Sequence, residues 1–331
     1  MLRPSCVVLV GLVFMQAAAA AAQAPYAQVA DIQIGGPLPA QWDYLTADAG
    51  AKRLYVSHNA EVVVIDTTTN TVVGRIADTP GVHGIAIGAG KVFTSNGREG
   101  TVSVVDPKTL ATLSKIDSGG ANPDAITFDP KRGEIWVFNH TGRSATQIEA
   151  ATGKVMATIA LTGTAESGQS DGAGKVFVNI EDKDQIDVID VASRKVQASW
   201  PVAPGAEPTG MAFDAASHRL FVGAGTVMVM LDAGNGRVVA TVPICAGTDA
   251  TWYDPSTKLA FSSCRDGRIT VARVEGDTMR VIQTIETSPG SRTMGLDAAT
   301  HRLYVAAARP NAAGGRGNDP NSFHVLVYAQ K

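Results

Sequence analysis

The chain carries little net charge, and this bears on the kind of partner it can bind. Its 28 lysines and arginines nearly balance its 31 aspartates and glutamates, which leaves a formal net charge of −3 over 331 residues. A protein that binds nucleic acid normally presents a basic face. We therefore expect no nucleic-acid partner.

Long apolar runs are missing beyond residue 24, although 45% of the residues are hydrophobic. A helix that crosses a bilayer needs about 20 consecutive apolar residues, so we expect no membrane span in the mature chain. A sustained helical period is also missing, as are haem-attachment, zinc-finger and dinucleotide-binding motifs. The remaining sequence alternates apolar and polar residues between turns, which predicts an all-β protein.

The first 24 residues have the features of a secretory signal peptide. Arg3 supplies the positive charge, residues 6–15 form a short apolar stretch, and residues 17–24 are mostly small. We expect cleavage between residues 20 and 24, which leaves residues 25–331 as a single domain in the periplasm or outside the cell. The alternative is an uncleaved anchor, for which the apolar stretch is short.

Cysteine is scarce, with 3 in the whole chain. Loss of Cys6 with the signal leaves Cys245 and Cys264, and an even number in an oxidising compartment favours a disulfide. Such a bond would close a loop of roughly 20 residues and stabilise the fold by about 3 kcal/mol. Two free buried thiols, or a metal site with other ligands, are the alternatives.

What the sequence does contain is a repeat of about 40 residues. In the first unit, four strand-like phrases cover residues 42–48, 53–57, 62–66 and 72–76. The marker that ends the first phrase recurs at Asp48, Gly88, Asp129, Asp171, Asp214, Asp254 and Asp297. Four strands per unit at this period are typical of a propeller blade.

The repeat predicts a seven-bladed β-propeller of four-stranded antiparallel blades. The units cover residues 41–79, 82–119, 122–162, 164–204, 207–246, 248–288 and 291–328. The last unit supplies only three strands before the chain ends. Residues 29–34 resemble an outer strand, so we expect the N-terminal segment to complete the last blade and close the ring.

Several phrases resemble the YVTN-type propeller repeat. They are residues 53–59, 91–96, 102–109 and 175–179. The chain is similar in this way to the YncE-like family of exported seven-bladed propellers. The resemblance implies a rigid binding platform and no uniform catalytic chemistry, because a fold alone does not specify a reaction.

Polar residues occupy one position of the repeat, five residues before each marker. Strand a, the innermost strand, begins there, so we expect these side chains to ring the mouth of the central channel. The residues are Asp43, His83, Asp124, Glu166, Thr209, Asp249 and Arg292. Strand b is expected to end on the same face, and its end residues add a second ring: His58, Asn96, His140, Glu181, Arg265 and Arg309.

Two functions fit this mouth. The first is a non-enzymatic platform, expected to be a monomer, that binds a small polar ligand or a protein partner. The alternative is a periplasmic metal-dependent hydrolase or lyase of the lactonase-like kind. A divalent metal is a possible cofactor, because carboxylates and the imidazoles of His58, His83 and His140 are suitable ligands.

Overall fold

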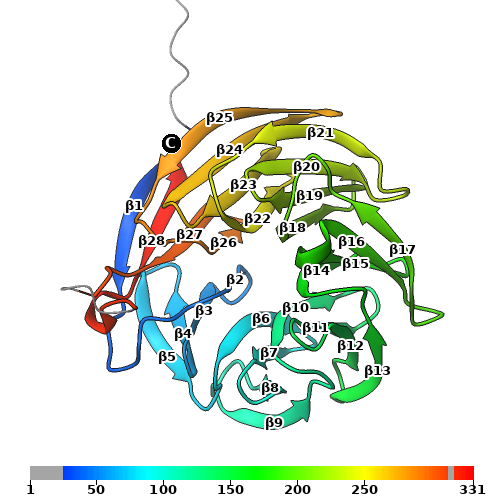
Figure 1. The fold of residues 1–331 in the computed structure, drawn as a ribbon. Helices are drawn as coiled ribbons and strands as arrows, with labels where there is room; N and C mark the ends of the chain where they lie inside the picture. The colour runs from blue at the N-terminus through cyan, green and yellow to red at the C-terminus, as the bar shows by residue number, and fades with distance from the viewer. Residues whose placement is uncertain (1–24, 312–316) are drawn as a thin grey trace, which may run out of the picture.

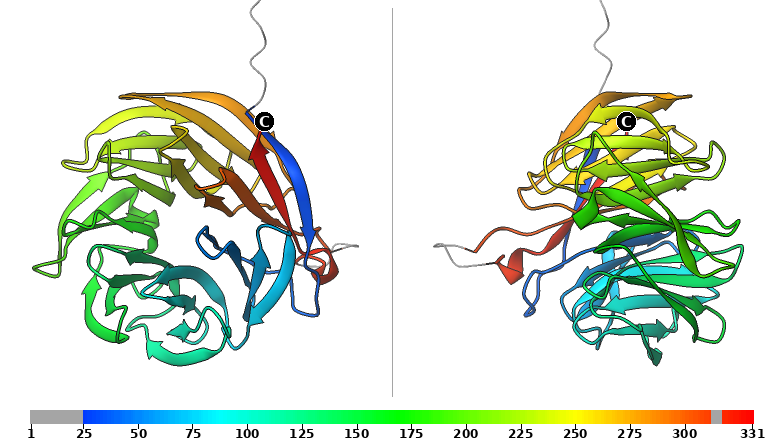
Figure 2. Two further views of the ribbon diagram at one scale, coloured as in Figure 1. Left: turned by 180° about the vertical axis from the view of Figure 1, so that it is seen from behind. Right: turned by 45° about the vertical axis from the view of Figure 1, so that its right-hand side comes forward.

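The computed structural model describes residues 25–311 and 317–331. Within these residues the chain forms seven four-stranded sheets that stand around a central axis (Figures 1 and 2). Adjacent strands within each sheet pair antiparallel. The predicted seven-bladed propeller is confirmed, whereas the predicted signal peptide falls on residues 1–24, outside the described residues.

Each blade has strands a to d, counted from the axis outward. Strand a is β2 (Leu45–Asp48), β6 (Val82–Gly88), β10 (Pro123–Asp129), β14 (Ala165–Ser170), β18 (Pro208–Asp214), β22 (Thr248–Asp254) and β26 (Met294–Asp297). Strand b is β3 (Arg53–His58), β7 (Lys91–Asn96), β11 (Glu134–Asn139), β15 (Lys175–Ile180), β19 (Arg219–Ala224), β23 (Leu259–Cys264) and β27 (Arg302–Ala307). Strand c is β4 (Glu61–Asp66), β8 (Thr101–Val105), β12 (Ser144–Glu149), β16 (Gln185–Asp190), β20 (Val227–Asp232), β24 (Arg268–Glu275) and β28 (His324–Gln330). Strand d is β5 (Thr71–Ile76), β9 (Thr112–Asp117), β13 (Lys154–Ala160), β17 (Lys195–Pro201), β21 (Val238–Pro243), β25 (Thr278–Glu286) and β1 (Tyr26–Gln33).

The ring closes through the first strand of the chain. The last sheet has the order β1-β28-β27-β26, so the two ends of the described chain share one blade (Figure 1). Tyr26 also reaches the preceding blade, where its main-chain N–H donates to Gln283 Oε1 at 2.9 Å and its carbonyl accepts from Gln283 Nε2 at 2.8 Å. The predicted closure by an N-terminal outer strand is confirmed.

The hydrophobic core lies between neighbouring blades. Between the first two blades, Tyr55 and Val64 pack with Ile85 and Val92, and all four side chains are buried. β-Branched and aromatic side chains suit such pleated, doubly covered surfaces. This packing fixes each blade against the next and so holds the inner strand ends in place around the axis.

Two short features lie in the b–c loops, and one covalent link joins two blades. The 3-10 helices η1 (Glu181–Lys183) and η3 (Pro320–Ser322) occur in the fourth and seventh blades. Cys245, just after β21, and Cys264, at the end of β23, form a disulfide. In the described residues, no helix is long and apolar enough to span a bilayer.

Candidate functional site

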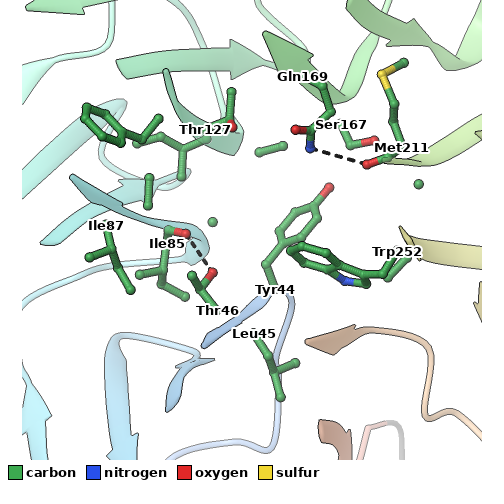
Figure 3. Close-up of a pocket in the computed structure, with 18 of the residues that line it drawn as sticks. Tyr44, Leu45, Thr46, Ile85, Ile87, Thr127, Ser167, Gln169, Met211 and Trp252 are labelled. Carbon is green, nitrogen blue, oxygen red and sulfur yellow. Dashed lines mark hydrogen bonds between the residues drawn. The ribbon is translucent and has the colours of Figure 1, made fainter. Parts of the chain in front are cut away.

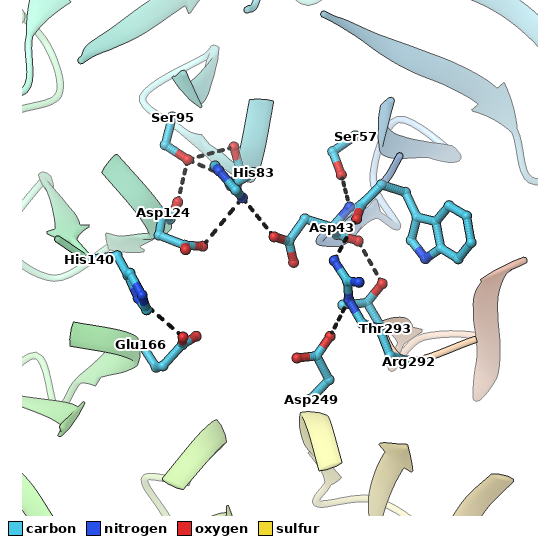
Figure 4. A network of polar contacts seen from close by, with 12 residues as sticks. Asp43, Ser57, His83, Ser95, Asp124, His140, Glu166, Asp249, Arg292 and Thr293 are labelled. Atoms are coloured by element: carbon cyan, nitrogen blue, oxygen red, sulfur yellow. Dashed lines mark hydrogen bonds and ion pairs between the residues drawn. The ribbon is translucent and has the colours of Figure 1, made fainter. Parts of the chain in front are cut away.

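The start of strand a places the predicted ring of polar side chains around one end of the channel. In three consecutive blades His83, Asp124 and Glu166 occupy the same place in β6, β10 and β14. Asp43 and Arg292 lie just before β2 and β26. Because equivalent positions in a closed ring face the same axis, these side chains converge (Figure 4).

The first contact in this network links three blades through His83. Its Nδ1 atom lies 2.7 Å from Asp43 Oδ2 and 3.8 Å from Asp124 Oδ1. Burial disfavours the protonated imidazole, but the hydrogen bond to Asp43 and the nearby carboxylates outweigh it and raise the pKa of His83 to about 9. His83 is therefore a cation at neutral pH.

A second pair lies in the third and fourth blades. His140 Nδ1 is 3.2 Å from Glu166 Oε1 and 3.0 Å from the carbonyl oxygen of Ala165. The hydrogen bond to Glu166 raises the pKa of His140 to about 9 in spite of burial. Burial raises the pKa of Glu166 to about 7, against the opposing effect of His140.

The opposite side of the mouth is built around Asp249. Its carboxylate lies 2.9 Å from Arg292 Nε and 3.5 Å from Arg265 Nη2. Arg292 also donates to the carbonyl oxygen of Trp42 at 3.1 Å. Burial and the charge of Asp43 raise the pKa of Asp249, and the two guanidinium groups oppose that shift.

Asp124 is joined to the network by an ion pair with His83. The residue is 7% exposed, and within residues 25–311 and 317–331 its carboxylate accepts no hydrogen bond. Burial and the charge of Asp43 raise the pKa of Asp124 well above its usual range. Two sets of three ligand atoms share this residue, Asp43–His83–Asp124 and Asp124–His140–Glu166, and within each set the atoms lie within 4.8 Å of one another. These five side chains are the ones that could hold a cation.

Serines of strand b hold the network's backbone in place, and the sequence analysis did not identify them. Ser57 Oγ accepts from the N–H of Asp43 at 2.7 Å. Ser95 Oγ accepts from the N–H of Gly84 at 2.8 Å and donates to the carbonyl oxygen of Asp124 in the next blade. The available signal was a hydroxyl residue one position before the end of strand b in several units.

His58 and Asn96, which were predicted to line the mouth, do not. His58 is 0% exposed, stacks on Phe323 with ring centres 4.4 Å apart, and lies 2.9 Å from Glu61 Oε1. Asn96, also 0% exposed, donates to Ser103 Oγ at 2.8 Å. Both are the last residues of their strands, and successive side chains of a strand point to opposite faces.

A register difference of one residue explains why His140 and Arg265 reach the mouth. Strand b of the third blade ends at Asn139, which donates to Ser144 Oγ at 3.0 Å just as Asn96 bonds within its own blade. His140 is the next residue, and Arg265 likewise follows the end of β23. The expected second ring therefore mixed three positions of the repeat: the last residue of strand b, the next residue and, for Arg309, the one after that.

Arg309 lies in the long loop of the last blade. Its guanidinium is 77% exposed and contacts Asp319 of the same loop at 3.4 Å. Its main-chain N–H donates to Ser322 Oγ at 2.8 Å. The structure thus places Arg309 with its own loop and not in the network of Figure 4.

A recess of about 570 Å³ opens beside the network, where the last blade meets the first two. Charged groups of both signs line it, including Asp43, His83, Arg98 and Arg292. The guanidinium of Arg98 donates to Asn59 Oδ1 at 2.9 Å. The volume of the recess lies in the usual range for small-molecule sites.

Tyr44, which follows the mouth residue Asp43, lines an apolar cavity in the channel. The cavity has a volume of about 340 Å³ and is lined by strand a of the first six blades (Figure 3). Polar side chains in its wall bond to neighbouring backbone, as Thr46 does to the carbonyl oxygen of Ile85 at 2.7 Å and Trp252 to that of Met294 at 2.8 Å. Burial, and then the charges of carboxylates including Asp124, raise the pKa of Tyr44 well above its usual range, so its hydroxyl stays protonated.

Comparisons with known proteins agree with this architecture. No family model matches the chain. An uncharacterized protein named YncE from Salmonella typhi is 24% identical over 285 residues, which cover 83% of this chain and 71% of that protein. YncE of Salmonella typhimurium is 23% identical over the same length and coverage.

Solved propellers share the fold at low sequence identity. The WD40 repeats of RRP9 superpose with a TM-score of 0.78 at 9% identity, covering 93% of this chain and 99% of theirs. A chain of Kuenenia stuttgartiensis hydrazine synthase gives a TM-score of 0.72 at 15% identity, covering 88% and 96%. The repeat and the closure by β1 make the chain a seven-bladed β-propeller, and its sequence is similar to that of YncE.

Proposed function

We propose that the protein is an exported binding propeller whose channel mouth takes a small polar ligand. The observation that carries this proposal is the convergence of Asp43, His83 and Arg292 on one recess of about 570 Å³. A few charged groups that converge on a pocket of this size are typical of a ligand site.

The charge pattern favours a zwitterionic ligand such as an amino acid or a short peptide. Carboxylates of Asp43 and Asp124 lie on one side of the mouth, and the guanidinium groups of Arg98 and Arg292 border the recess. An ammonium group would approach the carboxylates while a carboxylate approaches an arginine, which can bind it with two hydrogen bonds.

Export is supported by two features. Residues 1–24 have the composition of a signal peptide, and Cys245 and Cys264 are bonded. Disulfides persist in oxidising compartments such as the bacterial periplasm. We place the mature protein in the periplasm or outside the cell, as a monomer.

A calorimetric screen of zwitterionic solutes tests the proposal. We expect one ligand per chain, and binding at least about 10-fold weaker in Arg292→Gln, because a charged hydrogen-bonding partner is removed. Arg309→Gln is the matched control, since that arginine is exposed and bonds within its own loop. Equal loss in both variants, or no binding by any zwitterion, would contradict the proposal.

A metal-dependent hydrolase or lyase is the second candidate function. The observation that favours it is the pair of three-residue groups that share Asp124. Hydrolysis of a lactone or ester panel by metal-loaded protein, abolished in Asp124→Asn, would replace the binding proposal by this one.

A further inference from the structure

We propose that the side of the mouth formed by the first four blades is a binding site for one divalent transition-metal ion, with Asp124 at its centre. The site deepens the proposed function, on which its biological meaning rests, because the ion would take the place beside Asp43 and Asp124 that the ligand's ammonium group takes in the metal-free protein, and the ligand would then face the ion. We use Zn²⁺ as the probe ion in the argument and in the experiments.

The oxygen and nitrogen atoms that would bind the ion already lie close together. Asp43, His83 and Asp124 place three ligand atoms within 4.8 Å of one another, and Asp124, His140 and Glu166 do the same. The donors come from four different blades, and hydrogen bonds from strand-b serines hold the backbone of Asp43 and Asp124. The preformed spacing lowers the ordering cost of binding.

A second observation points to a missing partner. The Asp124 carboxylate accepts no hydrogen bond from the described residues, and its nearest cationic atom is His83 Nδ1 at 3.8 Å. That distance exceeds the usual length of a charged hydrogen bond. The Asp124 side chain is 11% exposed, so a ligand can reach it, and the distant imidazole of His83 is its one ion-pair partner in the described residues. A metal ion beside Asp124 would supply a closer partner.

The backbone around Asp124 is not free to move the carboxylate elsewhere. Ser95 donates to the carbonyl oxygen of Asp124 and is itself buried in strand b of the second blade. Gly84 approaches the same carbonyl so closely that a Cβ atom there would lie 2.9 Å from it. From this fixed backbone the carboxylate lies 3.8 Å from Nδ1 of His83 and in one group with His140.

The mixture of donors selects the class of ion. Each three-atom set offers one imidazole and two carboxylates, a mixture that suits zinc and its first-row neighbours, whereas calcium and magnesium prefer oxygen ligands alone. An imidazole binds the ion only in its neutral form, so zinc must displace the proton that His83 or His140 carries at neutral pH. We expect Zn²⁺ to bind in preference to Ca²⁺ at equal concentration.

The experiment titrates chelator-treated mature protein with Zn²⁺ by calorimetry and counts bound zinc by mass spectrometry after dialysis. We expect one ion per chain, with affinity at least about 10-fold lower in Asp124→Asn and in His140→Gln. His218→Gln is the matched control, because His218 is exposed in an a–b turn on the opposite face. We expect that variant to bind zinc like the wild type.

Cobalt replaces zinc to provide a spectroscopic readout that does not depend on affinity alone. Co²⁺ bound by imidazole and carboxylate should give a visible absorption band in the wild type that weakens or shifts in His140→Gln. Circular dichroism and thermal unfolding establish that each variant is folded, and Glu166→Gln replaces Asp124→Asn if the latter is not.

Two results would overturn the inference. One is zinc binding that is no stronger in the wild type than in both Asp124→Asn and His140→Gln. The other is equal weakening by His218→Gln, which would assign zinc to surface histidines. Zwitterion binding in the presence of chelator, with its loss in Arg292→Gln, reports separately on the proposed function, so either proposal can fail while the other holds.

Discussion

At the scale of single residues, the aspartate that marks the repeat closes the turn between strands a and b. Asp129 Oδ1 accepts from the N–H groups of Lys131 and Arg132 at 3.0 and 3.1 Å. Asp254 accepts from Ser256 N–H at 3.0 Å and from its hydroxyl at 2.7 Å. An aspartate that bonds the backbone two or three residues later is a standard turn device. The marker therefore recurs for a structural reason, away from the mouth.

Asp254 gives a prediction about the stability of the fold at low pH. Burial opposes ionisation of this carboxyl, but hydrogen bonds from Ser256, His301 and Thr257 outweigh it and hold the pKa of Asp254 below its usual range. A lowered folded-state pKa stabilises the protein above the unfolded-state value, about pH 4, and this stabilisation is lost as pH falls through the folded-state value. We expect Asp254→Asn to lose stability at pH 7 and to flatten the acid limb of the curve.

Chemical denaturation of wild type and Asp254→Asn between neutral pH and about pH 3 measures this effect. Asp31→Asn is the control, because Asp31 is exposed on the outer strand. An acid limb in Asp254→Asn as steep as that of the wild type would show that the turn aspartate is not responsible.

At the scale of elements, we expect the outer strand β1 to contribute strongly to the stability of the propeller. It pairs with β28 from Tyr26↔Gln330 to Gln33↔His324 and covers an edge that would otherwise be exposed. Tyr26 and Ile32 are 2% and 4% exposed. Burial of two such side chains stabilises the fold by roughly 3–6 kcal/mol.

Deletion of residues 25–34 should therefore lower the free energy of unfolding by an amount on the order of several kcal/mol and promote association through β28. Thermal unfolding and light scattering of the truncated and full mature chains test this expectation. Removal of the exposed residue Lys331 alone is the control. Unchanged unfolding after the ten-residue deletion would contradict closure of the ring by this strand.

At the scale of the whole molecule, we expect Tyr44 to close the propeller along its axis. The position that follows each mouth residue holds small residues in six blades: Gly84, Ala125, Ser167, Gly210, Ala250 and Thr293. Tyr44 is the large exception, and Figure 3 shows its ring standing in the channel beside Trp252. The ring of Tyr44 thus occupies space in the channel that the small residues of the other six blades do not fill.

Tyr44→Ala should join the polar mouth to the apolar cavity. We expect a crystal structure of the variant to show ordered water continuous between the two, with a loss of stability below the roughly 3–5 kcal/mol typical of a fully packed aromatic. Tyr44→Phe should keep the channel closed. Collapse of neighbouring side chains into the space, leaving the two cavities separate, would contradict this role.

The sequence alone determined the number of blades, the closure of the ring and the convergence of Asp43, His83 and Asp124. Equivalent positions in a closed repeat must occupy equivalent places around its axis, so a period read from the chain becomes a position in space. The serines beneath the network were not predicted, because a hydroxyl reveals its role only once its backbone partner is known.

Only the tertiary structure decided which strand-b residues face the mouth. His58 and His140 differ by one position in the repeat. As a result, the imidazole of His58 packs on Phe323, whereas that of His140 points toward Glu166. The repeat has a period of about 40 residues and varies by a few residues from unit to unit, so it cannot fix the end of a strand to a single residue. The contacts between blades, which combine segments far apart in the chain, set that register and with it the charges at the mouth.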